Sequence, residues 1–201
     1  MTRSRDNTAR EMRRLSARMV EGLHRDETCV DGDVLPAMAQ TLTSLRGRPV
    51  VIKRVEFPPD TASGLWLDLP DMDIIAVREG TTGPEHDAVI AGHEAWHMFQ
   101  GHCEAHTPAG PTAARAQLAV HVASEELVRL VIGDPEPAGL SAQVLRSAAR
   151  THFDREHETQ AETFGYRFAT DLRTWRKEAR RSQLGGVAGR IEGSLAKGPW
   201  A

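Results

Sequence analysis

The chain has 201 residues, 40% hydrophobic and 26% charged, which is typical of a globular domain with a sizeable core. The net charge of −3 and the lack of a long apolar run give no reason to expect nucleic-acid binding or a membrane span. Cys29 and Cys103 are too few for a disulfide framework, and the first residues lack the apolar stretch of a secretory signal. We therefore expect a cytoplasmic location.

Two amphipathic helices are predicted in the N-terminal quarter of the chain. The first follows a capping box at Thr8-Ala9-Arg10-Glu11 and repeats apolar residues at helical spacing. The second carries an apolar stripe from Leu35 to Leu45. From this layout we predict an N-terminal helical extension over residues 1–29 and a main domain over residues 30–178.

Three segments with β-branched or alternating apolar residues predict strands, at residues 49–55, 64–69 and 72–77. The links between them are short, and short links favour antiparallel pairing of neighbours in the sequence. The sequence therefore predicts an α+β fold, mainly helical, with a small three-stranded and mostly antiparallel sheet.

The next predicted helix has Pro84 and Glu85 in its first turn and ends at Gly101. It contains His93-Glu94-Ala95-Trp96-His97, an H-E-x-x-H array. On an α-helix, residues four apart lie on one face, so His93 and His97 can bind one Zn²⁺ together. Glu94 lies beside the first histidine and is placed to act as general base on a water molecule. The alternative is a histidine-rich helix whose imidazoles are partly buried and hydrogen-bonded.

After this helix, His102, Cys103 and His106 form a second group of possible metal ligands. They make only half of a zinc site, so a second metal is disfavoured. A long helix is predicted over residues 113–132. Its His121 either faces the cleft, where it could donate a hydrogen bond to a reaction intermediate, or belongs to the core or surface.

A catalytic zinc site needs a third protein ligand. A histidine supplied by His-x-x-Gly-x-x-His spacing is disfavoured, because the required positions hold Gln100 and Cys103. A helix predicted from residue 154 to residue 178 carries Glu158 and Glu162 on or beside its apolar stripe. Carboxylates on a buried face need a cation or a donor, which favours Glu158 as ligand and Glu162 as a residue that orients a ligand histidine.

The alternative for both glutamates is a solvated acidic edge that pairs with arginines at helical spacing. Tyr166, on the same helix, either approaches the cleft or packs against the core, and we expect packing. Residues 179–201 contain several glycines and few apolar residues, which predicts a flexible C-terminal tail.

The H-E-x-x-H helix, the turn at Gly101-His102 and a later Glu-x-x-Ala-x-x-Phe helix resemble the ImmA/IrrE family of metallopeptidases. This resemblance implies a zincin-like fold with the sheet packed on the motif helix. It also implies that zinc is held by His93, His97 and Glu158, and that Glu94 is the base. The chain departs from the family at Trp96, where relatives usually have glycine or alanine.

The resemblance implies a protein substrate such as a helix-turn-helix repressor, or a role as the toxin component of a two-gene module. Nucleic acid would then be involved only indirectly. In peptidases of this kind the strand before the motif helix is a sheet edge, so Asp73–Val77 either binds an extended peptide by strand addition or is an ordinary strand of the sheet. Trp66 is either a wall of that cleft or a core residue.

The sequence thus predicts a zinc-dependent metallopeptidase. Two alternatives remain open at this point. The first is a non-catalytic metal-binding regulatory module of the same fold, which Trp96 favours. The second is a metal-dependent hydrolase that acts on something other than a peptide.

Overall fold

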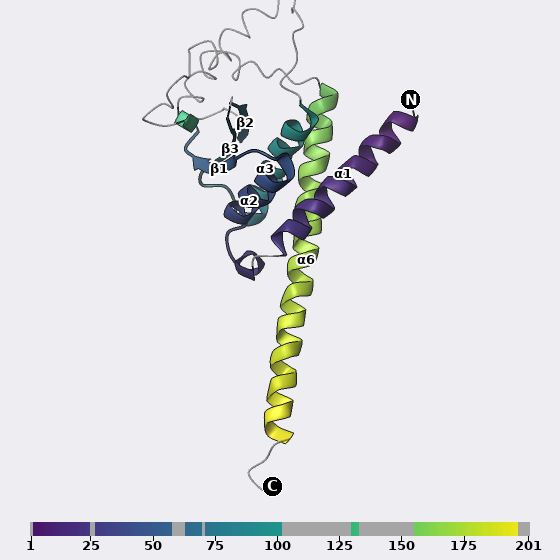
Figure 1. The fold of residues 1–201 in the computed structure, drawn as a ribbon, viewed down its shortest axis with the longest axis vertical. Coiled ribbons are helices and arrows are strands. Elements are labelled where there is room, and N and C mark those ends of the chain that lie inside the picture. The colour runs from purple at the N-terminus through teal and green to yellow at the C-terminus, as the bar shows by residue number, and fades with distance from the viewer. Residues whose placement is uncertain are drawn as a thin grey trace, which may run out of the picture.

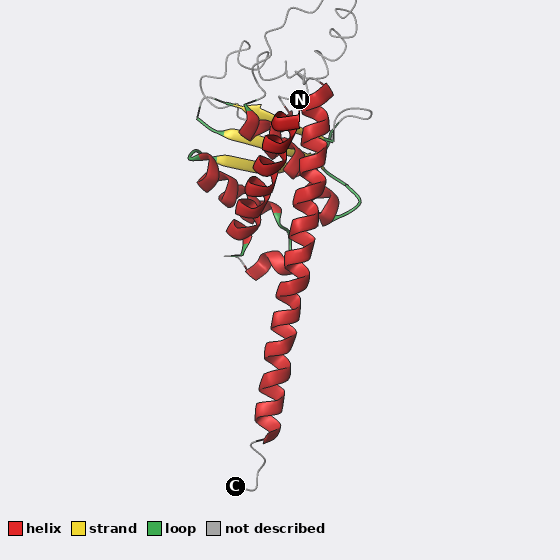
Figure 2. Cartoon of the chain, turned by 90° about the vertical axis from the view of Figure 1, so that its right-hand side faces the viewer, coloured by secondary structure: helices red, strands yellow, loops and turns green. Residues whose placement is uncertain are grey.

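The computed structural model describes the chain over residues 2–24, 27–57, 63–69, 71–101, 130–132 and 155–196. These residues form an α+β fold in which helices pack around a small three-stranded mixed sheet (Figure 1, Figure 2). Within them, no helix combines the length and the apolar character that a membrane span requires.

Helix α1 (Thr2–Leu23) crosses the long C-terminal helix, and a 3₁₀ turn, η1 (Glu27–Val30), leads from it to helix α2 (Leu35–Arg46). The predicted apolar stripe of α1 is buried, and Met19 and Leu23 are fully inaccessible. These residues share one continuous core with the sheet and the later helices. Helix α1 is therefore packed into the main domain, whereas the sequence predicts an extension.

The sheet consists of β1 (Val50–Val55), β2 (Gly64–Asp68) and β3 (Asp73–Arg78) in the order β1-β3-β2. Strand β3 runs parallel to β1 and antiparallel to β2, so the prediction of a mostly antiparallel sheet with sequential neighbours is wrong for β1. Strand β3 is buried from Asp73 to Val77, whereas β1 carries Lys53 and Arg54. The most apolar strand therefore takes the centre, where both of its faces are covered.

Both faces of the sheet are apolar. The inner face contributes Trp66, Ile75 and Val77 to the core shared with the helices. The outer face packs against Val131 and Ile132, and the ammonium of Lys53 donates to the backbone carbonyls of both residues, at 3.2 and 3.4 Å.

Helix α3 (Pro84–Gln100) begins and ends where the sequence predicts, with Pro84 in its first turn and Gly101 after its last residue. Helix α6 (Arg155–Ala196) lies beside α3 and then extends past the rest of the described chain (Figure 1, Figure 2). Its helical backbone continues to Ala196, through most of the segment predicted as a flexible tail.

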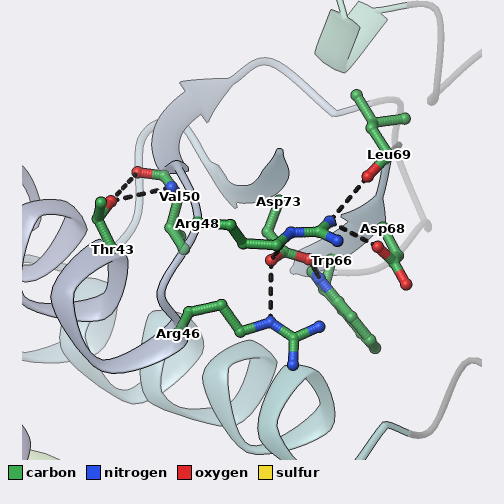
Figure 3. Close-up of polar contacts among 8 residues, drawn as sticks. All are labelled: Thr43, Arg46, Arg48, Val50, Trp66, Asp68, Leu69 and Asp73. Atoms are coloured by element: carbon green, nitrogen blue, oxygen red, sulfur yellow. Dashed lines mark hydrogen bonds and ion pairs between the residues drawn. The ribbon is translucent and has the colours of Figure 1, made fainter. Parts of the chain in front are cut away.

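A buried carboxylate fixes the start of β3 (Figure 3). Asp73 is fully buried and accepts hydrogen bonds from the indole N–H of Trp66 at 2.9 Å and from Arg46 Nε at 3.1 Å. Arg48 adds an ion pair at 2.9 Å and also donates to Asp68, 2.6 Å away. Because two donors would lose their acceptor and Arg48 would lose its counter-charge together, Asp73 holds the sheet to the end of α2.

We expect Asp73→Ala to lower the free energy of unfolding by about 3 kcal/mol, because it leaves partly buried cations without a counter-charge. Urea denaturation followed by circular dichroism measures the change. The matched control is Asp68→Ala, which removes a half-exposed partner of Arg48 and should cost about 0.5 kcal/mol. Equal losses in the two variants would contradict a special role for the buried carboxylate.

Candidate metal centre

Helix α3 places two imidazoles on one face, as the sequence predicts. His93 and His97 lie one turn apart, with ring centroids 4.7 Å apart and Nε2 atoms 3.0 Å apart. His97 is fully buried, whereas the side chain of His93 is 21% exposed. The pair is therefore closed to solvent at His97 and open to solvent at His93.

Helix α6 brings Glu158 to the same point from its first turns. Its two carboxylate oxygens lie 3.5 Å from His93 Nε2 and 3.5 Å from His97 Nε2. Ligand atoms bound at 2.0–2.1 Å to a tetrahedral zinc ion are separated by about 3.3–3.4 Å. The spacing and the chemistry of the three donors therefore fit a tetrahedrally coordinated metal ion. Among the described residues, His93, His97 and Glu158 are the group that could hold such an ion.

The two helices reach this distance because glycines meet where they cross. A Cβ atom added to Gly165 would lie 2.5 Å from the carbonyl oxygen of Val89, closer than side chains approach a backbone. On the facing helix, a Cβ added to Gly92 would lie 3.3 Å from the Cα atom of Gly165. The backbones are thus in direct contact one turn before His93, and this contact sets the distance to Glu158.

Trp96, the residue at which the chain departs from the family pattern, packs between the helices. It is fully buried and stacks on Phe164 of α6, with centroids 5.0 Å apart and an interplanar angle of 27°. Phe168 is also fully buried in this contact region, and Ala161 precedes them on the same stripe of α6. The indole therefore fills the contact between the two helices, and its buried N–H has no hydrogen-bond partner among the described residues.

Glu94 lies between α3 and strand β2. It is 7% exposed, and the backbone N–H of Trp66 donates a hydrogen bond to it. A Cβ on Gly64 would be 2.6 Å from Glu94 Oε1, so the strand can come this close only with glycine at that position. Burial, reinforced by the charge of Glu158, raises the pKa of Glu94 to about 8.

The other ionisable groups of the site also have shifted pKa values. Burial lowers the pKa of His93, which favours the neutral imidazole that metals bind. Burial and the nearby charge of Glu162 raise the pKa of Glu158. Glu162 itself is exposed and acts on His93 through its charge, so the structure does not give it the predicted role of orienting a ligand histidine.

A charge cluster anchors the start of α3. Asp87, in its first turns, is 5% exposed, accepts a hydrogen bond from Thr81 and forms an ion pair with Arg54 of β1 at 2.7 Å. Arg54 also pairs with Asp33, 2.6 Å away, and its hydrogen bond lowers the pKa of that carboxyl. Since the N-cap residue Gly83 offers no side-chain cap, this cluster positions the helix relative to the sheet.

The expected peptide-binding edge is wrong. Asp73–Val77 belongs to β3, the central strand, and Trp66 is a core residue with 2% exposure. The strand beside Glu94 is β2, and within the described part of the sheet β3 is its only partner. Tyr166 is 66% exposed, which also contradicts the expectation that it packs.

Several predicted candidates lie outside the described residues, namely His102, Cys103, His106 and His121. Sequence reasoning missed the contributions of Gly64, Gly92 and Gly165. A glycine at the buried face of a helix, as at Gly92 or Gly165, is a signal of close backbone approach that the sequence does contain. The ion pairs of Asp87 and Asp33 with Arg54 join distant segments and leave no such local signal.

Comparison of the chain with protein-family models, with curated proteins and with solved structures finds no significant match. The resemblance to the ImmA/IrrE metallopeptidases therefore rests on the motif residues alone.

We expect Gly165→Ala to push α3 and α6 apart, because the new methyl group would overlap the carbonyl oxygen of Val89. Overpacking of this kind costs about 1–3 kcal/mol, and the better helix propensity of alanine returns about 1 kcal/mol. Both the unfolding free energy and the affinity for divalent metal should fall, as measured by urea denaturation and metal titration.

The control is Thr163→Ala, an exposed position on the same helix. It should leave metal affinity unchanged. If Gly165→Ala bound metal as well as the parent chain, the helix crossing would not set the geometry of the site.

Proposed function

We propose that the protein is a zinc metallopeptidase in which His93, His97 and Glu158 hold the ion and Glu94 acts as general base. The observation that carries this proposal is the convergence of two imidazole nitrogens and one carboxylate, 3.0–3.5 Å apart, beside a buried fourth residue that is also acidic. Two nitrogens and one oxygen make up the donor set of many zinc hydrolases.

When bound, zinc supplies a Lewis acid that polarises a carbonyl group and lowers the pKa of water to about 7. The chain supplies the proton transfer. A carboxylate oxygen of Glu94 accepts a proton from the attacking water molecule. Glu94 then donates this proton to the amine of the peptide bond that is cut. The hydrogen bond from the Trp66 backbone fixes the side chain in place for this transfer.

The raised pKa of Glu94 is consistent with a role that depends on the ion. With a pKa of about 8, the carboxyl group carries its proton at pH 7. A divalent cation held by the neighbouring residues would stabilise the carboxylate and lower this pKa. Glu94 would therefore become a base only in the metal-loaded protein.

Strand β2 supplies an edge for a peptide substrate. It contacts α3 at Gly64, next to the carboxylate of Glu94, and pairs on one side with β3. An extended peptide could add to its other side through main-chain hydrogen bonds, with side-chain pockets giving specificity. In this proposal β2 takes the role that the sequence assigned to Asp73–Val77.

The substrate class follows from the resemblance to the ImmA/IrrE family. It is a regulatory protein such as a helix-turn-helix repressor, and a role as the toxin component of a two-gene module belongs to the same proposal. The packing of Trp96 on Phe164 supports this proposal over the non-catalytic module, because the indole lies in the helix contact.

We expect the purified protein to bind one equivalent of zinc, and His93→Ala to lose at least 90% of it, because removing one of three ligands leaves an incomplete site. Elemental analysis measures the content. The matched control is His86→Ala, an exposed histidine seven residues earlier on the same helix. Zinc content that is equal in the two variants would place the metal elsewhere.

We expect Glu94→Gln to keep its zinc and to lower the rate of peptide cleavage about 10²–10⁴-fold, because the amide cannot accept the proton. The assay uses the zinc-loaded full chain with a library of quenched fluorescent peptides and with a candidate repressor. A wild-type chain that holds zinc and leaves every substrate intact would support the non-catalytic binding module instead.

A further inference from the structure

A cavity of about 570 Å³ lies between the start of α3 and the middle of α6, outside the group formed by His93, His97 and Glu158. Helix α3 and the loop before it contribute Thr82, His86 and Val89 to its lining. Helix α6 contributes Tyr166 and Arg173.

The cavity continues the seam that holds the candidate metal centre. The two helices run in opposite directions along this seam, because Glu158 meets His93 and His97 whereas the later Gly165 meets the earlier Val89. Seven residues separate His86 from His93 on the same face of α3, a rise of about 10 Å. The His86 end of the cavity is therefore about 10 Å from His93, whereas Arg173 lies fifteen residues beyond Glu158 on α6, a rise of about 22 Å.

The open side of the centre is the side that faces this cavity. His93, the ligand nearer to His86 in the helix, is 21% exposed, whereas His97, one turn further away, is fully buried. Glu158 is 41% exposed. On the exposed side of the helix crossing, Glu162 lies between Glu158 and Tyr166 and is exposed, and Val89 lies between His86 and His93 and is half-buried.

The cavity has the chemistry of an anion-binding pocket. Arg173 is exposed and forms no ion pair with any other residue that the structure describes. Tyr166 has an exposed ring and a hydroxyl group that can donate, and Thr82 adds a second hydroxyl. An arginine beside such donors is suited to a planar carboxylate, which it can bind through two parallel hydrogen bonds.

Glu85 also lines the cavity and is the one carboxylate among its described lining residues, so a ligand carboxylate would have to bind at the Arg173 end. Arg173 is the arginine among the lining residues.

We propose that this cavity is a specificity pocket for a carboxylate group of the substrate, about three to six residues from the peptide bond that is cut. An extended chain advances about 3.3 Å per residue, so about three residues span the distance from His93 to the His86 end of the cavity and about six span the distance to Arg173. This inference rests on the proposed peptidase function. The carboxylate comes either from an acidic side chain or from the C-terminus of the peptide.

The test uses zinc-loaded full-length protein and short peptides that carry a hydroxamate, a strong zinc ligand, at one end or the other. One glutamate is placed at a position from about one to about eight residues from the hydroxamate, and glutamine replaces it in the paired peptide. Isothermal titration calorimetry should give the tightest binding with glutamate about three to six residues away, about tenfold tighter than its glutamine pair.

Arg173→Gln should abolish this tenfold preference, and Arg181→Gln should retain it, because Arg181 is exposed on the same helix and does not line the cavity. A glutamate-to-glutamine ratio near one at every position would overturn the proposal, and so would a preference that survives Arg173→Gln. A glutamine peptide that ends in a free carboxylate at the preferred distance, compared with its amide, tells a C-terminal carboxylate from a side chain.

Failure of the metal centre gives a different result. In that case the hydroxamate peptides bind no more tightly than peptides that end in a simple amide. The pocket is then tested with glutamate and glutamine peptides that end in an amide instead of a hydroxamate. Their affinities are measured for the parent protein and for the Arg173→Gln variant. A preference for glutamate that depends on Arg173 supports the pocket, and its absence refutes it.

Discussion

The geometry of the candidate metal centre depends on one contact, the close crossing of helices α3 and α6. Gly165 meets the backbone of Val89 at a distance that no larger residue allows, and Gly92 faces it. With the backbones in contact, His93, one turn after Val89, and Glu158, about two turns before Gly165, can meet at one point. Trp96 fills the space on the far side of the crossing, so the same contact that forms the site also forms much of the core.

The sheet places strand β2 against the side of α3 that faces away from α6. Strand β2 reaches Glu94 because Gly64 has no side chain, and the strand encloses the carboxylate while its backbone donates a hydrogen bond. The enclosure raises the pKa of Glu94, and a cation on the adjacent residues would lower it again. Gly64 therefore allows β2 to bury Glu94, and this burial raises the pKa of the proposed base.

Buried charges hold the sheet and the helices in register. Asp73 gathers two arginines and an indole at one end of the sheet, and Arg54 joins Asp87 of α3 to the entrance of α2. Each cluster joins segments that are distant in sequence. Such clusters favour one arrangement of the elements over others. Any arrangement that separated the partners would leave a buried charge unpaired, and an unpaired buried charge is strongly destabilising.

The sequence by itself determined what depends on local spacing. It located the helices, the three strands, the bounds of α3 and the face that His93 shares with His97, since helical and strand periods are local properties of the chain. Only the tertiary structure decided which strand lies at the centre, which strand flanks Glu94 and where Tyr166 points. These outcomes depend on which surfaces are covered when the whole chain packs, and burial is a property of all the elements together. Glu158 combines both kinds of information. The sequence showed a carboxylate on an apolar stripe, but its contact with the histidines depends on the close helix crossing at the glycines.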